Sequence, residues 1–339
     1  MSPPGRARSR RCTSGTGHRW YSSRLLSATF IVPPRDRADK RSATSAPRRP
    51  SAHLDSHRAA HRVGIRRGAR HPHRVLRRWR PDGPPTGILL LAHGLGEHAR
   101  RYDHVVERLV GLGLVVYAPD HRGHGRSGGK RIELHDWSEF LDDLHRLSAV
   151  AIAENPGLQR FLLDTAWGGA IALSYALDHQ DELSGLILSA PAVDVVGGKP
   201  RVVIEIGKIL GRFAPGIPVE DPRREVGLPR SGGGRGVRVR PSRPSGKVKA
   251  GIARGMILAA ESFPARLPSL TIPVLLLHGT EDRLADVSGS RMIAAHAGSK
   301  DLTLKTYDGL FHEVFNEPEQ EREGARRSRR LAPPAPGVT

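Results

Sequence analysis

The strongest constraint on this chain is a series of short, wholly apolar runs, each as long as a β-strand. Residues 88–92 read Ile-Leu-Leu-Leu-Ala, and residues 114–118 read Leu-Val-Val-Tyr-Ala. Strands that are buried on both faces of a parallel sheet show continuous apolar runs of this kind. Further runs of this kind follow at residues 161–163, 186–188, 272–277 and 302–305. The sequence therefore predicts a doubly wound, mostly parallel α/β sheet.

Helical patterns fill the gaps between these runs. Apolar residues recur at helical spacing over residues 102–112, 136–154 and 168–177, so each range is predicted to form a helix. Ahead of the first run, only residues 74–80 suggest a strand, a weak one at the edge of the sheet. The predicted core therefore comprises residues 81–194 and 265–322.

The strand-and-helix rhythm stops over residues 195–264. One amphipathic helix is expected at residues 202–213 and another at 251–260, with an irregular Arg-, Gly- and Pro-rich segment at 223–246 between them. A helical insertion after a central strand, at the catalytic end of a sheet, is where a cap or lid lies. The alternative is that the first helix is an ordinary packing helix.

The net charge of +20 is concentrated outside the predicted core. Residues 1–86 hold 21 Lys and Arg against 4 Asp and Glu, and residues 223–250 hold 9 against 1. Such composition predicts disorder in residues 1–80, 225–246 and 323–339. Nucleic-acid binding by the basic segments is the alternative, but Lys40 is the only lysine before residue 86, whereas nucleic-acid-binding tails usually mix Lys with Arg.

The sequence also bears on the location of the protein and on the chemistry open to its cysteine. No secretory signal or membrane-spanning segment is apparent, so a cytoplasmic or peripheral membrane location is expected. Because Cys12 is the single cysteine, neither an internal disulfide nor a cysteine-based metal cluster can form within the chain.

Residues 161–170, Phe-Leu-Leu-Asp-Thr-Ala-Trp-Gly-Gly-Ala, read as a strand, a sharp turn and the start of a helix. Serine hydrolases hold their nucleophile at such a turn in the pattern Gly-x-Ser-x-Gly. Here the last glycine is Gly168, but Ala166 stands at the serine position and Asp164 at the first glycine. Thr165 has a hydroxyl, but one residue away at a sharp turn it points elsewhere. The turn is therefore predicted without its nucleophile.

Four further motifs surround this turn, in one order along the chain. They are His-Gly-Leu-Gly-Glu-His at 93–98, Asp-His-Arg-Gly-His-Gly-Arg-Ser at 120–127, His-Gly-Thr-Glu-Asp-Arg-Leu at 278–284, and Tyr-Asp-Gly-Leu-Phe-His-Glu-Val at 307–314. Together they resemble the monoacylglycerol lipase/lysophospholipase family of α/β-hydrolases over residues 81–222 and 247–322. The resemblance implies an α/β-hydrolase fold with a helical cap, an acyl-lipid substrate, ester hydrolysis and no cofactor.

The same resemblance assigns a catalytic triad. Ala166 occupies the nucleophile position, Asp282 the acid position and His312 the general-base position, in the chain order of this fold. Glu281 is the rival of Asp282. As the chain is written, we expect it to be inactive, because an alanine methyl has no oxygen that can attack an ester.

The oxyanion hole is predicted from backbone N–H groups, those of Leu95 and Trp167. Gly94 and Gly96 would let the backbone approach the substrate, and His93 supports the same loop. Residues 120–127 are interpreted as a rigid supporting loop. Their histidines have no accompanying carboxylate or cysteine pattern, so no metal site is expected there.

Two hypotheses explain the missing serine. The family turn commonly reads Gly-His-Ser-Met-Gly-Gly, and GGA-CAC-AGC-ATG is one coding of its first four residues. Loss of one G from the first codon, with the first G of the following glycine codon read in, gives GAC-ACA-GCA-TGG, which spells Asp-Thr-Ala-Trp, as in residues 164–167. A pair of compensating insertions and deletions is the first hypothesis. The second is a non-catalytic relative that binds a lipid, with basic tails on an anionic membrane or nucleic acid.

Overall fold

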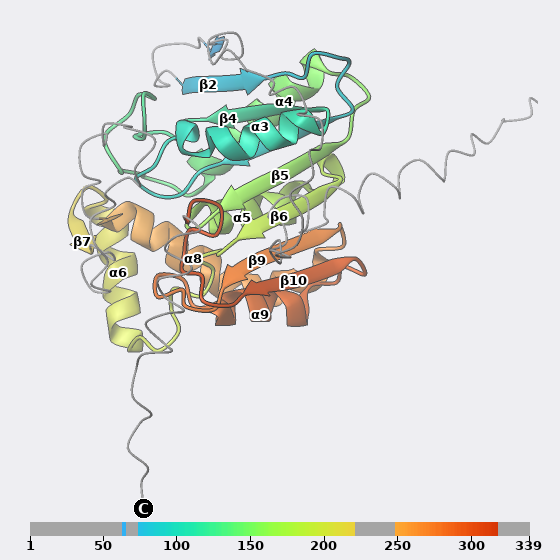
Figure 1. The fold of residues 1–339 in the computed structure, drawn as a ribbon. Helices are drawn as coiled ribbons and strands as arrows, with labels where there is room; N and C mark the ends of the chain where they lie inside the picture. The colour runs from blue at the N-terminus through green and yellow to red at the C-terminus, as the bar shows by residue number, and fades with distance from the viewer. Residues whose placement is uncertain (1–62, 66–73, 221–247, 318–339) are drawn as a thin grey trace, which may run out of the picture.

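The computed structural model describes residues 63–65, 74–220 and 248–317, and their main feature is one eight-stranded sheet (Figure 1). Its spatial order is β1-β2-β4-β3-β5-β6-β9-β10. The strands are β1 (Val63–Ile65), β2 (Arg74–Trp79), β3 (Gly87–Ala92), β4 (Leu114–Pro119), β5 (Arg160–Thr165), β6 (Gly185–Ser189), β9 (Val274–Gly279) and β10 (Leu302–Tyr307). All neighbouring strands from β4 to β10 pair in parallel. Strand β2 pairs antiparallel with both of its neighbours, β1 and β4. The predicted doubly wound α/β sheet is confirmed.

Helices cover both faces of the sheet (Figure 1). They are α3 (Asp103–Gly111), α4 (Ser138–Glu154), α5 (Gly168–His179), α6 (Arg201–Phe213), α8 (Ala250–Arg266) and α9 (Val287–His296), with short 3₁₀ turns η1 (Ala99–Tyr102), η2 (Gln180–Glu182) and η3 (Leu267–Ser269). Helices α4, α5 and α9 contribute to the core on one face, and α3 to the core on the other. The helices predicted at 102–112, 136–154 and 168–177 are confirmed within two residues at each end.

The core follows from the alternation of side chains along each strand. On β3, Ile88 and Leu90 belong to the cluster beneath α4 and α5, whereas Leu89 and Leu91 belong to the cluster beneath α3. Because successive residues of a strand point to opposite faces, a strand covered on both faces must be apolar throughout. All six residues of β3 and of β4 are buried.

Strand β2 corrects the predicted start of the core. Residues 74–80 were expected as a weak edge strand and residues 1–80 as disordered, but β2 lies between β1 and β4. Its Leu76 is only 2% exposed, and Arg78 forms an ion pair with Glu154 on α4. Because three of its six residues are arginines, β2 lacks the continuous apolar pattern that would have predicted an internal strand. The rest of residues 1–80, segment 223–246 and residues 323–339 lie outside the described residues.

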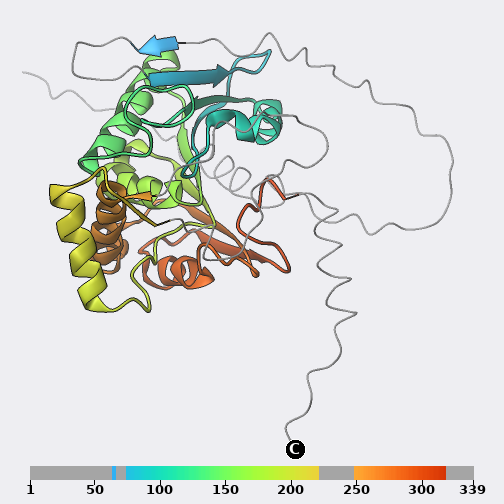
Figure 2. The same ribbon diagram turned by 90° about the vertical axis from the view of Figure 1, so that its left-hand side faces the viewer.

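The cap region contains α6 and α8, which lie side by side at one end of the molecule in both views (Figure 2). A two-stranded hairpin of β7 (Pro218–Glu220) and β8 (Val248–Lys249) joins them. Both helices were predicted, although α8 runs beyond the expected end at residue 260. The hairpin and α9 were not predicted. The start of α9 had a sequence signal in Asp286, whose carboxylate accepts a hydrogen bond from Ser288 N (2.7 Å) as an N-cap.

Candidate active site

The sharp turn between β5 and α5 has the geometry of a nucleophile elbow. Ala166 has a φ of +59°, in the left-handed region that non-glycine residues seldom adopt. Its N–H donates to Ser189 O on β6 (2.8 Å), and its carbonyl accepts from Gly169 N (3.0 Å) and Ala192 N (3.0 Å). These bonds hold residue 166 in a strained conformation, as serine hydrolases hold their nucleophile.

Asp164 fits this turn poorly. Its side chain is fully buried, and although Oδ1 accepts a hydrogen bond from Thr165 N (2.6 Å), Oδ2 has no hydrogen-bond partner among the described residues. The carboxyl group also lies so close to Gly168 that a Cβ at position 168 would overlap it. Burial raises the pKa of Asp164 well above its usual range, so folding favours the protonated form of this group. A glycine would leave this space free.

Asp282 and His312, the acid and the general base predicted from the sequence, lie in direct contact. They follow the ends of β9 and β10, and His312 Nδ1 lies 2.8 Å from Asp282 Oδ2. The other oxygen, Oδ1, accepts hydrogen bonds from Leu284 N (2.8 Å) and Ala285 N (3.0 Å). His278 also contacts this carboxylate, with its Nε2 3.2 Å from Asp282 Oδ2. The carboxylate that contacts His312 is thus that of Asp282, and not that of the neighbouring Glu281.

The environment of this pair sets its charges. Burial opposes ionisation of Asp282, but hydrogen bonds with His278 and His312 outweigh it and hold the pKa of Asp282 well below its usual range. Burial also lowers the pKa of His312, but its hydrogen bond to Asp282 and the charge of that carboxylate outweigh the burial and raise the pKa overall. An ionised aspartate beside a histidine orients the ring and stabilises the imidazolium that forms when the histidine accepts a proton.

The loop after β3 lies directly against the elbow. A Cβ built on Gly94 would lie 3.2 Å from the Cβ of Ala166. Neither Leu95 N nor Trp167 N donates a hydrogen bond to another described residue. Gly96 has a φ of +75°, which a glycine adopts without strain. The loop that carries Leu95 thus contacts the elbow that carries Trp167, and the N–H groups of these two residues are the ones predicted for the oxyanion hole.

Glu97 and Arg101 connect this loop to the histidine loop, and neither was predicted from the sequence to have a role. The buried carboxylate of Glu97 accepts from Gly94 N (3.2 Å) and lies 3.7 Å from Arg101 Nε. Arg101 also forms an ion pair with Glu313, the residue after His312. This chain of contacts brings the elbow and the His312 loop to the same edge of the sheet. The signal that could have identified Glu97 was its place in the motif at 93–98.

His93 stabilises the loop after β3 through two hydrogen bonds. It is fully buried, with Nδ1 2.8 Å from Gly94 O, and Nε2 accepts from His121 N (3.0 Å). Burial lowers the pKa of His93, so the ring is neutral and able to accept that bond. His93 thus links the loop after β3 to the loop after β4, and its supporting role remains a prediction.

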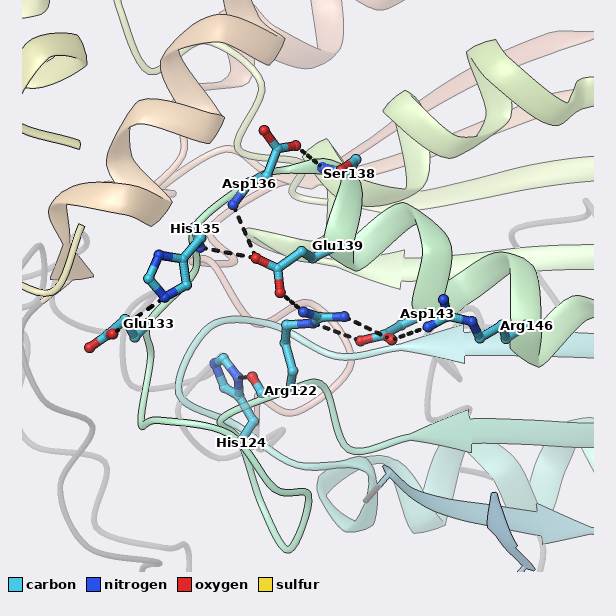
Figure 3. Close-up of polar contacts among 9 residues, drawn as sticks. All are labelled: Arg122, His124, Glu133, His135, Asp136, Ser138, Glu139, Asp143 and Arg146. Atoms are coloured by element: carbon cyan, nitrogen blue, oxygen red, sulfur yellow. Dashed lines mark hydrogen bonds and ion pairs between the residues drawn. The ribbon is translucent and has the colours of Figure 1, made fainter. Parts of the chain in front are cut away.

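The supporting loop at 120–127 is tied to α4 (Figure 3). Arg122 makes a two-pronged ion pair with Asp143 (2.9 and 3.0 Å) and a further ion pair with Glu139. Glu139 in turn accepts the backbone N–H groups of His135 and Asp136, each at 3.1 Å. Arg122 thus holds the loop to α4 through Glu139 and Asp143.

Trp167 fills the space beside the elbow. Its ring contacts Phe140 (5.1 Å between centroids) and Trp137 (5.8 Å) edge-on and stacks against His124 (6.2 Å). A separate cavity of about 460 Å³ adjoins the cap and is lined by Val196, Lys199, Arg201, Ile204, Glu205 and Glu261. None of these six belongs to the predicted catalytic set.

Comparisons with known proteins agree with this architecture. Residues 83–319 match the family described as "Serine aminopeptidase, S33". The chain is 46% identical over 242 residues to the monoacylglycerol lipase of Mycolicibacterium smegmatis, covering 71% of this chain and 86% of that protein. It is 32% identical to the monoglyceride lipase of Homo sapiens, covering 71% and 80% of the two chains.

Among solved structures, the monoacylglycerol lipase of Paleococcus ferrophilus has a TM-score of 0.60 and 29% identity, covering 75% of this chain and 96% of that one. The motifs, the sheet order and these matches all point the same way. The chain therefore belongs to the monoacylglycerol lipase/lysophospholipase family of α/β-hydrolases.

Proposed function

We propose that the reaction of this site is hydrolysis of a carboxylic ester of a monoacylglycerol or lysophospholipid, and that the present chain does not catalyse it. The observation that carries the proposal is Ala166, held at a φ of +59° beside Gly94 at the edge where Asp282 and His312 are paired. In this proposal His312 is the general base, the N–H groups of Leu95 and Trp167 are the oxyanion donors, and only the nucleophile is missing.

The expected reaction follows from these positions. With a hydroxyl at residue 166, His312 would take its proton as the oxygen attacks the acyl carbonyl. The N–H groups of Leu95 and Trp167 would stabilise the oxyanion, and Asp282 the imidazolium. His312 would then return the proton to the leaving alcohol, and water would release the fatty acid. Loss of the nucleophile alone lowers kcat by about 10⁶-fold in a serine protease.

The test is to rebuild the turn. Combining Asp164→Gly, Thr165→His, Ala166→Ser and Trp167→Met restores the family pattern and removes the buried carboxyl. We expect this variant to react with a fluorophosphonate probe and to hydrolyse a monoacylglycerol, and the unmodified chain to do neither. Ala166→Ser alone should give partial recovery, because Asp164 still crowds Gly168.

The matched control is His312→Ala in the rebuilt variant, which should remove both labelling and hydrolysis while the fold persists. Equal labelling of the unmodified and rebuilt chains would show that the nucleophile lies elsewhere. Labelling that survives loss of His312 would remove that residue from the catalytic set.

A second candidate function, contact with a lipid surface, is favoured by the outer face of α6. Val202, Ile206, Ile209 and Phe213 are 58–77% exposed. At 100° per residue they fall within an arc of about 60°. Among the described residues, no helix combines the length and apolarity that crossing a bilayer requires. Amphipathic helices bind at the membrane interface by burying their apolar face in the lipid. Lys and Arg residues near such a helix add attraction to anionic lipids. We therefore propose peripheral contact with an anionic lipid surface.

A further inference from the structure

Two histidines and a glutamate meet far from the elbow, where α4 packs against the C-terminal end of α5. His145 lies on α4, His179 is the last residue of α5, and Glu182 belongs to η2. Helix α5 starts beside the elbow and rises about 1.5 Å per residue, so His179 lies on the order of 16 Å from it. None of the three side chains has a role in ester hydrolysis.

The distances between these side chains suit a metal ion. His145 Nδ1 lies 3.3 Å from Glu182 Oε1, and His179 Nδ1 lies 3.9 Å from the same oxygen. One ligand atom from each residue can be chosen so that all three lie within 4.8 Å of one another. Ligands bound to zinc at about 2.0–2.2 Å in a tetrahedron are separated by roughly 3.3–3.6 Å. Small side-chain rotations therefore bring the three atoms onto one ion.

Glu182 is held in an orientation that favours this use. Its other oxygen, Oε2, accepts hydrogen bonds from Tyr175 OH (2.9 Å), Ser148 Oγ (3.1 Å) and Arg160 Nη1 (3.2 Å). These donors fix the carboxylate while Oε1 faces the imidazoles, in the way that outer partners orient metal ligands.

The two imidazoles are already arranged face to face. Their ring centroids are 4.8 Å apart with an interplanar angle of 24°, and both rings are accessible, His145 at 50% and His179 at 34% side-chain exposure. A metal can enter from solvent, and water can complete its coordination. The guanidinium of Arg160 reduces the negative charge of the site, so we expect moderate rather than tight binding.

We propose that His145, His179 and Glu182 form a binding site for a divalent transition metal such as Zn²⁺, which links α4 to the end of α5. Two imidazoles and one carboxylate are a ligand set that zinc accepts. An ion that binds the folded chain alone stabilises it, and this one would join two helices on the same face of the sheet. The inference is independent of the proposed ester hydrolysis.

The experiment is thermal unfolding of the full chain with and without Zn²⁺, using Mg²⁺ as the hard-cation control. At a Zn²⁺ concentration about tenfold above Kd, we expect Tm to rise by about 3–6 °C. Histidines elsewhere in the chain can bind zinc, but a site that exists equally in the unfolded chain gives no such rise. Mg²⁺ should have no effect, because it prefers oxygen ligands.

Matched variants decide whether this cluster is responsible. His145→Ala and His179→Ala, both at accessible positions, should each abolish the zinc-dependent rise in Tm. His135→Ala, at an exposed histidine 3.9 Å from Glu133 with a side-chain exposure of 70%, should retain it. His145→Cys replaces one zinc ligand with another and should restore part of the rise. No rise in the unmodified chain, or an unchanged rise in both alanine variants, would overturn the proposal.

Discussion

Asp164 and Asp282 are two buried carboxyl groups in opposite environments. Asp282 has two histidines and two backbone N–H groups around it, and its pKa is held low. Asp164 has one backbone N–H, and its pKa is raised well above the usual value. Satisfied hydrogen bonds and opposite charge compensate for lost hydration in one case and not in the other. The same residue type therefore stabilises one loop and strains the other.

The strain at Asp164 predicts a pH dependence of stability. The unfolded chain loses this proton near the ordinary value of 3.8, whereas the folded chain keeps it to a much higher pH. Because the folded state binds more protons in that interval, the free energy of unfolding falls as pH rises above about 4, by up to about 1.4 kcal/mol per pH unit. Urea unfolding between pH 5 and pH 8 measures it.

The matched variant is Asp164→Asn, which keeps the shape of the side chain and removes the ionisation. The gap in unfolding free energy between the Asp164→Asn variant and the unmodified chain should widen steadily with pH. Parallel pH profiles for the two proteins would show that the Asp164 carboxyl ionises in the folded chain at no cost.

At the scale of elements, residues 160–179 form the strand, turn and helix of the family fold, although residues 164–167 depart from the family pattern. The bonds from Ala166 to Ser189, Gly169 and Ala192 are backbone bonds, so they do not depend on the side chains at 164–167. Gly168 and Gly169, which follow directly, still permit close packing: a Cβ at position 169 would lie 2.6 Å from Pro191 Cβ. The fold of this element is thus consistent with an alteration confined to four residues.

That confinement makes the coding hypothesis testable at the DNA level. If two compensating indels produced Asp-Thr-Ala-Trp, the gene should align to those of close relatives with one nucleotide missing before codon 165 and one added shortly after codon 167. Resequencing the locus measures this directly. A gapless codon alignment through this stretch would instead support substitution of the nucleophile.

The outer face of α6 gives the second prediction at this scale. Replacing both Ile206 and Ile209 with Glu removes two side chains whose burial in a lipid interface is worth roughly 1.5–3 kcal/mol each. We expect co-sedimentation with anionic phospholipid vesicles to weaken by at least about tenfold. Leu112→Glu, at a 38%-exposed leucine that ends α3, is the control and should bind normally. Unchanged binding of the double variant would exclude α6 as the contact.

At the scale of the whole molecule, the family fold is present although Ala166 stands at the position predicted for the nucleophile. The 46% identity to a monoacylglycerol lipase covers 71% of this chain, and the parallel strands occur in the expected order. Fold stability depends on burial spread over many residues, whereas catalysis depends on a few atoms at one edge of the sheet. One turn can therefore lose its chemistry while the surrounding sheet and helices remain.

The sequence by itself determined the parallel sheet, because continuous apolar runs form strands only where both faces are covered. It also determined which loops carry Ala166, Asp282 and His312, since each follows the carboxyl end of a strand. These inferences needed only the order of apolar runs and motifs along the sequence, and the strands of the folded chain follow that order.

Only the tertiary structure decided which groups meet and which faces are covered. Glu281 and Asp282 are adjacent acidic residues in the loop after β9. In the folded chain it is the carboxylate of Asp282 that contacts His312. The spacing of apolar residues in α6 identified one face, but whether protein or solvent covers it depends on where α8 packs. The arginines of β2 likewise concealed an internal strand. Periodicity records that a face is apolar, and long-range packing alone selects its partner.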